Sequence, residues 1–404
     1  MSDQEQQLPN IPHDIMVDIL SRLPAKSLLK FRCVCKSWNS MIRNQKFTEF
    51  HLKRTMANAS QQRVLLSVKP FWSIKYDDLD DFGKDGFDVI IKKDTPSSLG
   101  CLGSNNDFEL VGHCNGLICI VLRKGRRSHQ DPIERTFCLW NPSTNECWQI
   151  SSDDVANDIV SSNSMFRGEY YNRFEIFGFG YDLTIDDYKI VRLISYDELD
   201  VVQVEIFTIG RRTWRKEEFH LDYVVNLLSY DRIHDCLFLN GALHWINTLY
   251  YVEQKEILSF NLEQEQLQVM RIDRHAIKSL FNRTNLRVIS GKLVLVTNPG
   301  DTEIWVMDEY GVETSWTKKA TLRAIPCDGM WGAHEKLSPL CFSKKGDILV
   351  RVRDFHYMMY DLERKIYRKA GGNQLNNRPH SSMYVESLIS PNRIPNVERR
   401  EPLS

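Results

Sequence analysis

The chain has 404 residues, of which 42% are hydrophobic and 26% charged, a balance typical of folded globular proteins and not of disordered ones. Its 52 Lys and Arg residues against 53 Asp and Glu residues give a formal net charge of -1, which excludes a global positive field for holding nucleic acid or an anionic membrane. The longest apolar stretch, Leu117 to Leu122, is far shorter than the roughly 20 residues of a membrane-spanning helix. The first seven residues are polar and acidic, unlike a signal peptide, so we expect a protein of the cytoplasm, the nucleus or both that is not secreted.

The sequence contains 10 cysteines, which are scattered, with Cys33 and Cys35 as the only close pair. A single Cys-x-Cys, without a second pair or neighbouring histidines, does not make a zinc site. We therefore predict reduced and mostly buried cysteines, no metal site and no cofactor.

The first 55 residues have apolar positions at helical spacing. Pro12 is suited to open a helix that ends before Pro24, a second short helix is expected over residues 25–31, and a third contains Trp38. The band of apolar residues on the first helix is wider than one buried face requires. It therefore indicates either a partner for this head or docking of the head on the rest of the chain.

The run from Ile11 to Trp38 resembles an F-box, the helical module that attaches substrate receptors to the Skp-family adaptor of SCF ubiquitin ligases. Ile11 and Ala25 stand where the family usually has Leu and Val, and both remain apolar. The resemblance implies adaptor binding through Pro12, Ile15, Ile19, Leu20, Leu23, Pro24, Leu28, Leu29, Val34 and Trp38. It predicts that Leu20→Asp or Leu23→Asp abolishes this binding, because each change buries an unpaired charge at an apolar contact.

From Arg63 onward, short apolar runs alternate with turns, which is typical of β-strands. Five hairpins with turns such as Asn115-Gly116 and Asn240-Gly241 are each followed by a second hairpin, so the pattern repeats every 50 to 70 residues. This period indicates the blades of a β-propeller. Five blades are expected from Phe108 to about Gly372, and the late strand 383–390 is predicted to pair with residues 63–68 and close a sixth.

The β body lacks the Trp-Asp signature, and Gly-Gly, typical of each kelch blade, occurs once. It resembles the F-box-associated, kelch-like domain of the large plant F-box family, which includes the S-locus F-box proteins. The matching segments are Gly112 to Cys119, Leu139 to Thr144, Phe177 to Asp182, Leu239 to Trp245 and Tyr384 to Leu388. We thus expect a mainly β protein with a three-helix F-box: a tail at residues 1–10, the F-box at 11–55, the propeller-like domain at 60–392 and a tail at 393–404.

Two motifs could indicate chemistry. Cys114, within Gly112-His113-Cys114-Asn115-Gly116, fits the Gly-x-nucleophile-x-Gly pattern of a hydrolase, but the next residues predict a strand where that motif needs a helix. Gly178-Phe179-Gly180 lacks the third glycine and the helix of a dinucleotide loop, so these glycines are expected to allow close strand packing. The sequence therefore predicts a protein without a catalytic residue.

Two charged segments are candidate contact sites for a target protein, because loops at the faces of a propeller are open to partners. Charge runs are more often solvated surface, and the Trp residues of the blades are expected to pack the core. The candidate residues are Asp77, Asp78 and Asp80 in an acidic segment and Arg123, Lys124, Arg126 and Arg127 in a basic one.

Together these patterns predict a non-catalytic substrate receptor of an SCF-type ubiquitin ligase. The head would bind the Skp-family adaptor and, through it, a cullin and a RING subunit, while the β body would hold an unidentified target protein for ubiquitination and proteasomal degradation. Nucleic acid and membranes are not expected partners. Two alternatives remain open: an S-locus F-box protein that recognises pistil ribonucleases, and a binding or scaffold propeller outside the ubiquitin system.

Overall fold

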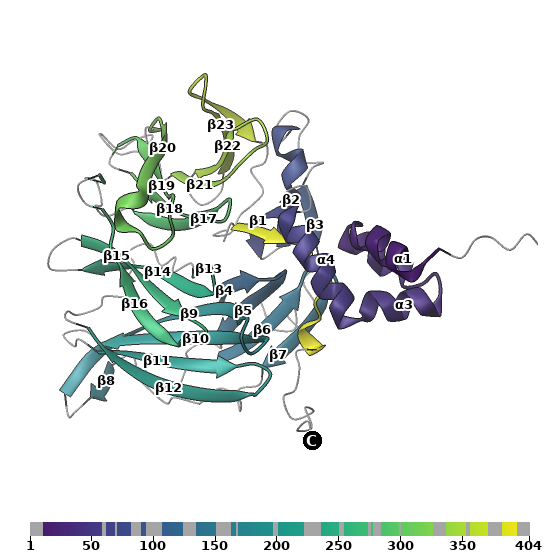
Figure 1. Cartoon of the computed structure of the whole chain (residues 1–404). Helices are drawn as coiled ribbons and strands as arrows, with labels where there is room; N and C mark the ends of the chain where they lie inside the picture. The colour runs from purple at the N-terminus through teal and green to yellow at the C-terminus, as the bar shows by residue number, and fades with distance from the viewer. Residues whose placement is uncertain are drawn as a thin grey trace, which may run out of the picture.

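A computed structural model shows a small helical head beside a ring of β-sheets (Figure 1). It describes residues 11–58, 62–68, 71–81, 90–93, 107–123, 135–150, 163–166, 169–196, 201–221, 236–249, 254–273, 276–277, 284–298, 300–325, 337–352, 356–370 and 382–393. In this part of the chain no helix is both long and apolar enough to cross a membrane.

The head consists of α1 (His13–Ser21), α2 (Ala25–Phe31), α3 (Lys36–Arg43) and α4 (Gln45–Ala57). As predicted, Pro12 and Pro24 precede helices, since a proline costs no hydrogen bond at a helix start. The three expected helices are present, and a fourth helix that the sequence did not indicate, α4, follows α3 directly. Its apolar side chains are too few to give a clear period, and its buried face includes the polar residues His51 and Thr55.

The β body is a ring of six sheets, which confirms the predicted six-bladed propeller. The first blade consists of β4 (Asp107–Cys114), β5 (Leu117–Arg123), β6 (Arg135–Asn141) and β7 (Glu146–Ile150). The second has five strands, β8 (Asn163–Phe166), β9 (Glu169–Asp182), β10 (Asp187–Tyr196), β11 (Val201–Thr208) and β12 (Thr213–His220). The third consists of β13 (Leu237–Leu239), β14 (Ala242–Leu249), β15 (Gln254–Asn261) and β16 (Gln266–Met270). The fourth blade consists of β17 (Asn285–Ile289), β18 (Lys292–Thr297), β19 (Thr302–Met307) and β20 (Trp316–Leu322). The fifth consists of β21 (Leu337–Phe342), β22 (Ile348–Val352), β23 (His356–Asp361) and β24 (Ile366–Ala370).

The sixth blade joins the two ends of the domain. It contains β25 (Ser382–Val385), β1 (Gln62–Val68), β2 (Phe71–Lys75) and β3 (Ile90–Lys93) in this spatial order. β1 and β25 are antiparallel, with Gln62 opposite Val385 and Leu65 opposite Ser382. The predicted ring closure is therefore confirmed, although the paired strand is shorter than expected.

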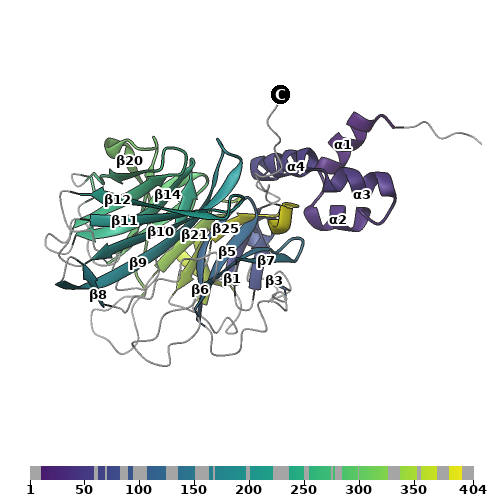
Figure 2. The same cartoon turned by 90° about the horizontal axis from the view of Figure 1, so that it is seen from below.

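Two kinds of turn recur because most blades repeat one pair of hairpins. In the first kind, Asn115 and Gly116 both have positive φ, 53° and 80°, as a two-residue hairpin turn requires. In the second kind a residue in the left-handed region, such as Asn145, donates its backbone N–H to the residue four positions earlier, Asn141, at 2.8 Å. Both kinds lie at the end of the ring that meets the head (Figure 2).

Neighbouring blades pack through the close contacts expected of the Gly-Phe-Gly segment. A Cβ added at Gly178 would lie 2.7 Å from the Trp245 ring, and one at Gly180 would lie 2.6 Å from Phe238. The indole of Trp245 is buried and donates a hydrogen bond to the backbone oxygen of Phe177 at 3.2 Å. The prediction that these glycines serve strand packing is confirmed.

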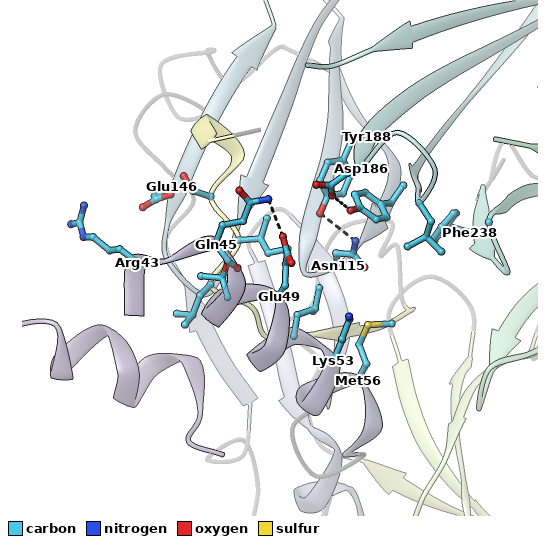
Figure 3. Close-up of a pocket in the computed structure, with 18 of the residues that line it drawn as sticks. Arg43, Gln45, Glu49, Lys53, Met56, Asn115, Glu146, Asp186, Tyr188 and Phe238 are labelled. Carbon is cyan, nitrogen blue, oxygen red and sulfur yellow. Dashed lines mark hydrogen bonds between the residues drawn. The ribbon is translucent and has the colours of Figure 1, made fainter. Parts of the chain in front are cut away.

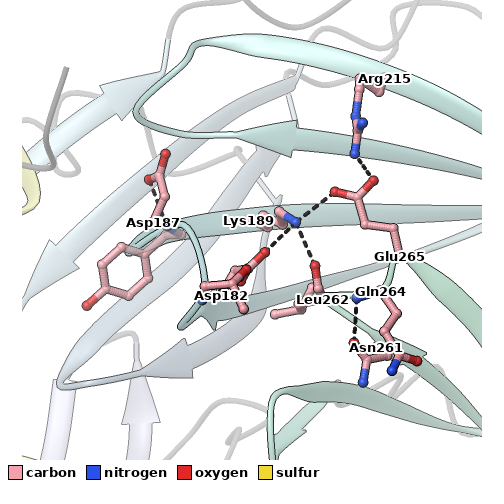
Figure 4. A network of polar contacts seen from close by, with 10 residues as sticks. Asp182, Asp187, Lys189, Arg215, Asn261, Leu262, Gln264 and Glu265 are labelled. Carbon is pink, nitrogen blue, oxygen red and sulfur yellow. Dashed lines mark hydrogen bonds and ion pairs between the residues drawn. The ribbon is translucent and has the colours of Figure 1, made fainter. Parts of the chain in front are cut away.

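A buried lysine adds a polar connection between the second and third blades (Figure 4). The ammonium of Lys189 on β10 is 2.7 Å from a carboxylate oxygen of Asp182 and 2.7 Å from one of Glu265. It also donates to the backbone oxygen of Leu262 at 2.6 Å, and Glu265 in turn pairs with Arg215. All charges in this network are thus compensated by opposite charges or hydrogen bonds.

Most cysteines among the described residues are free, as predicted, and one pair is an exception. Cys114, Cys119, Cys236 and Cys341 are free and buried, whereas Cys33 and Cys35 are free and exposed. The expectation of reduced cysteines is wrong at Cys138 and Cys147, which form a disulfide between β6 and β7. The hairpin brings their Cα atoms to 6.8 Å from each other, a proximity that the scattered spacing in the sequence did not indicate.

Candidate adaptor-binding surface

One side of the head exposes large aliphatic side chains. Ile15 and Ile19 on α1 and Ile11, just before it, recur every four residues and are 51%, 48% and 52% exposed, respectively. Val34, between α2 and α3, is 61% exposed. A row at four-residue spacing lies on one face of a helix, so α1 presents an apolar stripe that none of the described residues covers.

The other predicted contact residues are leucines and a tryptophan that lie deeper and two prolines that are exposed. Leu20 and Leu28 are 2% and 0% exposed and belong to the core of the head. Leu23, Leu29 and Trp38 are half-buried and pack against that core, while Pro12 and Pro24 are exposed at the starts of their helices. The structure therefore divides the predicted set into residues that build the head and residues that are available for contact.

A polar framework fixes α1 against α4. The guanidinium of Arg54 donates to the backbone oxygen of Asp18 at 2.9 Å and to the hydroxyl of Ser21 at 2.7 Å, and it pairs with the Asp18 carboxylate. This pairing holds the pKa of Asp18 below its usual value. His51 is buried and lies 2.9 Å from the backbone oxygen of Leu23, and burial lowers its pKa. The exposed stripe is thus carried by a helix with a fixed position.

The C-terminal segment attaches the head to the propeller. Leu388 is 2% exposed and belongs to the same cluster as Leu28 and Phe47 of the head. Gly116 leaves room for this segment, because a Cβ there would lie 2.4 Å from the hydroxyl of Ser387. Sequence reasoning assigned this segment to a blade and missed its role in the head. An apolar run of the form Tyr384 to Leu388 is compatible with either place.

The two charged segments proposed as target contacts lie at opposite ends of the propeller. Asp77 and Asp78 belong to a short 3-10 helix, Tyr76–Asp81, that follows β2 at the end nearer the head. The Asp77 carboxylate lies 2.6 Å from the Lys344 ammonium, so this charge is already paired. Arg123 ends β5 at the end away from the Asn115-Gly116 turn.

Several of the charged residues predicted to contact a target lie outside the part of the chain that the structure describes. Lys124, Arg126 and Arg127 lie outside the described residues, and the side chains of Asp80 and Arg123 are not described either. Of the two segments, the structure thus places Asp77 and Asp78 and the backbone of Arg123, which lie at opposite ends of the propeller.

The possible catalytic motif lies in a hairpin and not in a strand-to-helix turn. Cys114 ends β4, and β5 begins at Leu117. The thiol is buried, and this burial raises its pKa well above the ordinary value, which opposes formation of a nucleophilic thiolate. Among the residues that the structure describes, no group of His, Cys, Asp and Glu side chains could hold a metal ion.

Comparison with protein families assigns both parts of the chain. Residues 8–50 match the F-box domain, and residues 73–391 match the F-box associated beta propeller domain. The chain belongs to the F-box proteins with an associated propeller. The first range contains the exposed stripe of α1, and the second contains the blades except β1 and the start of β2.

Curated relatives are similar to this chain over most of its length. An F-box/kelch-repeat protein of Arabidopsis thaliana, At3g23880, is 25% identical over 391 residues, which cover 95% of this chain and 96% of the relative. The F-box protein CPR1 of the same plant is 26% identical over 380 residues, covering 89% of this chain and 83% of the relative.

Solved structures give a weaker likeness. A putative 6-phosphogluconolactonase from Bacteroides fragilis aligns with a TM-score of 0.36 at 10% identity, covering 81% of this chain and 98% of that one. A Trypanosoma rangeli sialidase gives the same TM-score and identity over 76% of this chain and 52% of its own. Alignments at this level carry no argument about activity.

Proposed function

We propose that this F-box protein is the substrate-recognition subunit of an SCF-type ubiquitin ligase. The exposed apolar stripe of α1, within the matched F-box, carries the proposal. Ile15 and Ile19 would pack into an apolar groove of the Skp-family adaptor, and the adaptor would connect the chain to a cullin and a RING subunit. The propeller would hold a target protein for ubiquitination and proteasomal degradation.

The mechanism is proximity. A target held on the propeller stays near the ubiquitin-loaded enzyme at the other end of the assembly, which raises the effective concentration of its lysines there. The insertion of Leu388 into the head supports this function, because it limits movement between head and propeller. No residue of this chain needs to react, and the buried thiol of Cys114 is consistent with a non-catalytic receptor.

The test replaces the exposed stripe without touching the core. We expect Ile15→Asp together with Ile19→Asp to weaken adaptor binding by about 100-fold or more, since two apolar anchors become charged. Leu20→Asp is less informative because Leu20 is 2% exposed, and its loss would unfold the head. Binding is measured by titrating the purified full chain with the adaptor.

Ile366→Asp is the matched control. Ile366 is 47% exposed on β24, in a blade and not in the head, so its replacement should leave adaptor affinity unchanged. Undiminished adaptor binding by the α1 double variant, with its fold intact, would refute the proposal and favour a scaffold protein outside the ubiquitin system.

A narrower form of the proposal makes this chain an S-locus F-box protein whose target is a pistil ribonuclease. It is motivated by the family resemblance of the β body. Capture of such a ribonuclease by the full chain, and by the chain without residues 1–55, is the expected result. Failure to bind a panel of these ribonucleases would contradict this narrower proposal and leave the target protein unidentified.

A further inference from the structure

A groove of about 760 Å³ lies between α4 and the turns of the propeller (Figure 3). Its volume is within the range of sites that enclose organic ligands, roughly 300 to 1,000 Å³. One wall consists of α4 residues from Gln45 to Met56. The other contains Asn115, Asp186 and Asn240, which belong to the turns at the starts of three neighbouring blades.

The length of the groove suits a short extended peptide. Gln45 and Met56 span eleven steps of α4, and a helix rises about 1.5 Å per residue, so the wall is roughly 16 Å long. An extended chain rises about 3.3 Å per residue, so about five residues would fill this length. The geometry therefore favours a segment of a protein.

Two carboxylates face the groove from its opposite walls. Glu49 comes from α4, and its carboxylate accepts a hydrogen bond from the Gln45 amide at 2.9 Å. Asp186 comes from the β9–β10 turn and accepts a hydrogen bond from the Tyr181 hydroxyl. Both lie near enough to Tyr181 to raise its pKa, in addition to the larger effect of burial.

Neither carboxylate has a cationic partner among the described residues. The lining also contains Glu146, Arg32, Arg43 and Lys53. Around Tyr181 it combines the two carboxylates with neutral hydrogen-bonding groups, the hydroxyls of Tyr181 and Tyr188 and the amide of Asn115. Such a site complements one positive charge. Figure 3 shows Arg43 at one end of the groove, whereas Lys53 lies between Glu49 and Met56 on α4.

Apolar side chains adjoin the two carboxylates. Leu183, three residues before Asp186, is 79% exposed, and Met56 is 52% exposed. Phe238 is half-buried in the same lining. Exposed aliphatic groups of this size beside a cleft are suited to the apolar neighbours of a charged anchor residue.

We propose that this groove binds an extended segment of the target protein in which a lysine or arginine is followed or preceded by a bulky apolar residue. The basic side chain would lie between Glu49 and Asp186, and the apolar one would contact Leu183 and Met56. This inference rests on the proposed receptor function. It places the contact with the target protein at the junction between the head and the propeller. The target would then touch α4 as well as the propeller.

The experiment selects ligands from a position-scanning library of acetylated hexapeptide amides on the purified full chain bound to its adaptor. We expect enrichment of Lys or Arg at one position with an apolar residue beside it. In the double variant Glu49→Gln with Asp186→Asn, the enriched peptide should bind about tenfold more weakly or worse. Asn tolerates the positive φ of 53° at position 186, so the turn should survive.

Glu263→Gln is the matched control, because Glu263 is an exposed carboxylate in a turn outside the groove. It should leave peptide affinity unchanged. Adaptor affinity, measured on the same samples, should stay the same in all variants, so failure of the receptor proposal and failure of the groove proposal are distinguishable.

Three results would overturn the proposal: no enrichment of basic residues, enrichment that the double variant retains, or enrichment that appears only after removal of residues 394–404. The last would assign the groove to the chain's own C-terminal tail. Equal enrichment with and without that tail is the expected result.

Discussion

Asn141 of β6 donates its side-chain amide to the backbone oxygen of Ile389 at 2.7 Å. The same amide lies 3.1 Å from the backbone oxygen of Ser387, so one buried asparagine holds both neighbours of Leu388. This leaves the side chain of Leu388 to pack in the core of the head. A single segment thus belongs to the propeller through its backbone and to the F-box through its side chain.

Leu388→Ala should loosen the head. The change removes a side chain that is 2% exposed, and comparable substitutions lower the free energy of unfolding by about 2 to 5 kcal/mol. We expect faster hydrogen exchange at the backbone amides of α1 to α4, with little change in the central strands of the blades. Leu183→Ala, at a position 79% exposed, should leave both unchanged. Unaltered exchange in the head of the Leu388 variant would contradict its place in that core.

Lys189→Met should destabilise the propeller, because Asp182 and Glu265 would lose the ammonium between them (Figure 4). Removal of one partner from a buried ion pair costs about 3 to 5 kcal/mol. Addition of Asp182→Asn should restore part of this loss, since it removes the uncompensated charge. The free energies are obtained from urea unfolding of the single and double variants.

Lys318→Met provides the comparison for Lys189. Lys318 is 44% exposed and pairs with Glu303 at 2.9 Å, so its loss should cost less than about 1 kcal/mol. Equal effects of the two lysine substitutions would show that burial does not strengthen the Lys189 network.

Acidification should weaken the fold partly through His244. This imidazole is buried, lies 2.8 Å from the Tyr310 hydroxyl, and has its pKa lowered from 6.5 to about 4 because burial disfavours the charged form. Between these values the unfolded chain binds a proton that the folded chain does not. The free energy of unfolding therefore falls as the pH drops from 6.5 to 4, by up to about 3 kcal/mol.

His244→Gln should flatten this part of the pH profile. Asp187 should change the free energy of unfolding in the opposite direction on acidification, because burial raises the pKa of its carboxyl from 3.8 to about 6. Its protonation favours the folded state as the pH falls through this range, so Asp187→Asn should make the loss steeper. Urea unfolding of the three proteins between pH 4 and 7 measures the slopes. A wild-type slope in the His244 variant would rule out this origin.

Much of the architecture could be predicted from the sequence, because local patterns determine it. Asn115-Gly116 and its equivalents have the backbone freedom that hairpin turns need, and their regular recurrence predicts blades whatever the contacts between them. Pro12 and Pro24 mark helix starts in the same local way. The helical head and the six-bladed ring therefore followed from helix starts, turn chemistry and periodicity, whereas the F-box assignment came from the resemblance of residues 11–38 to that family.

Contacts between distant segments were decided only by the tertiary structure. The stripe of Ile15 and Ile19 and the buried Leu20 lie on one helix, and only packing against α2 to α4 determines which residues remain exposed. α4 has too few apolar residues for a clear period, and Leu388 alternates like any strand residue. Its insertion into the head, and the groove between Glu49 and Asp186, depend on how the closed ring meets that head. Burial and charge pairing across such a junction are properties of surfaces brought together by folding, and no local sequence pattern encodes them.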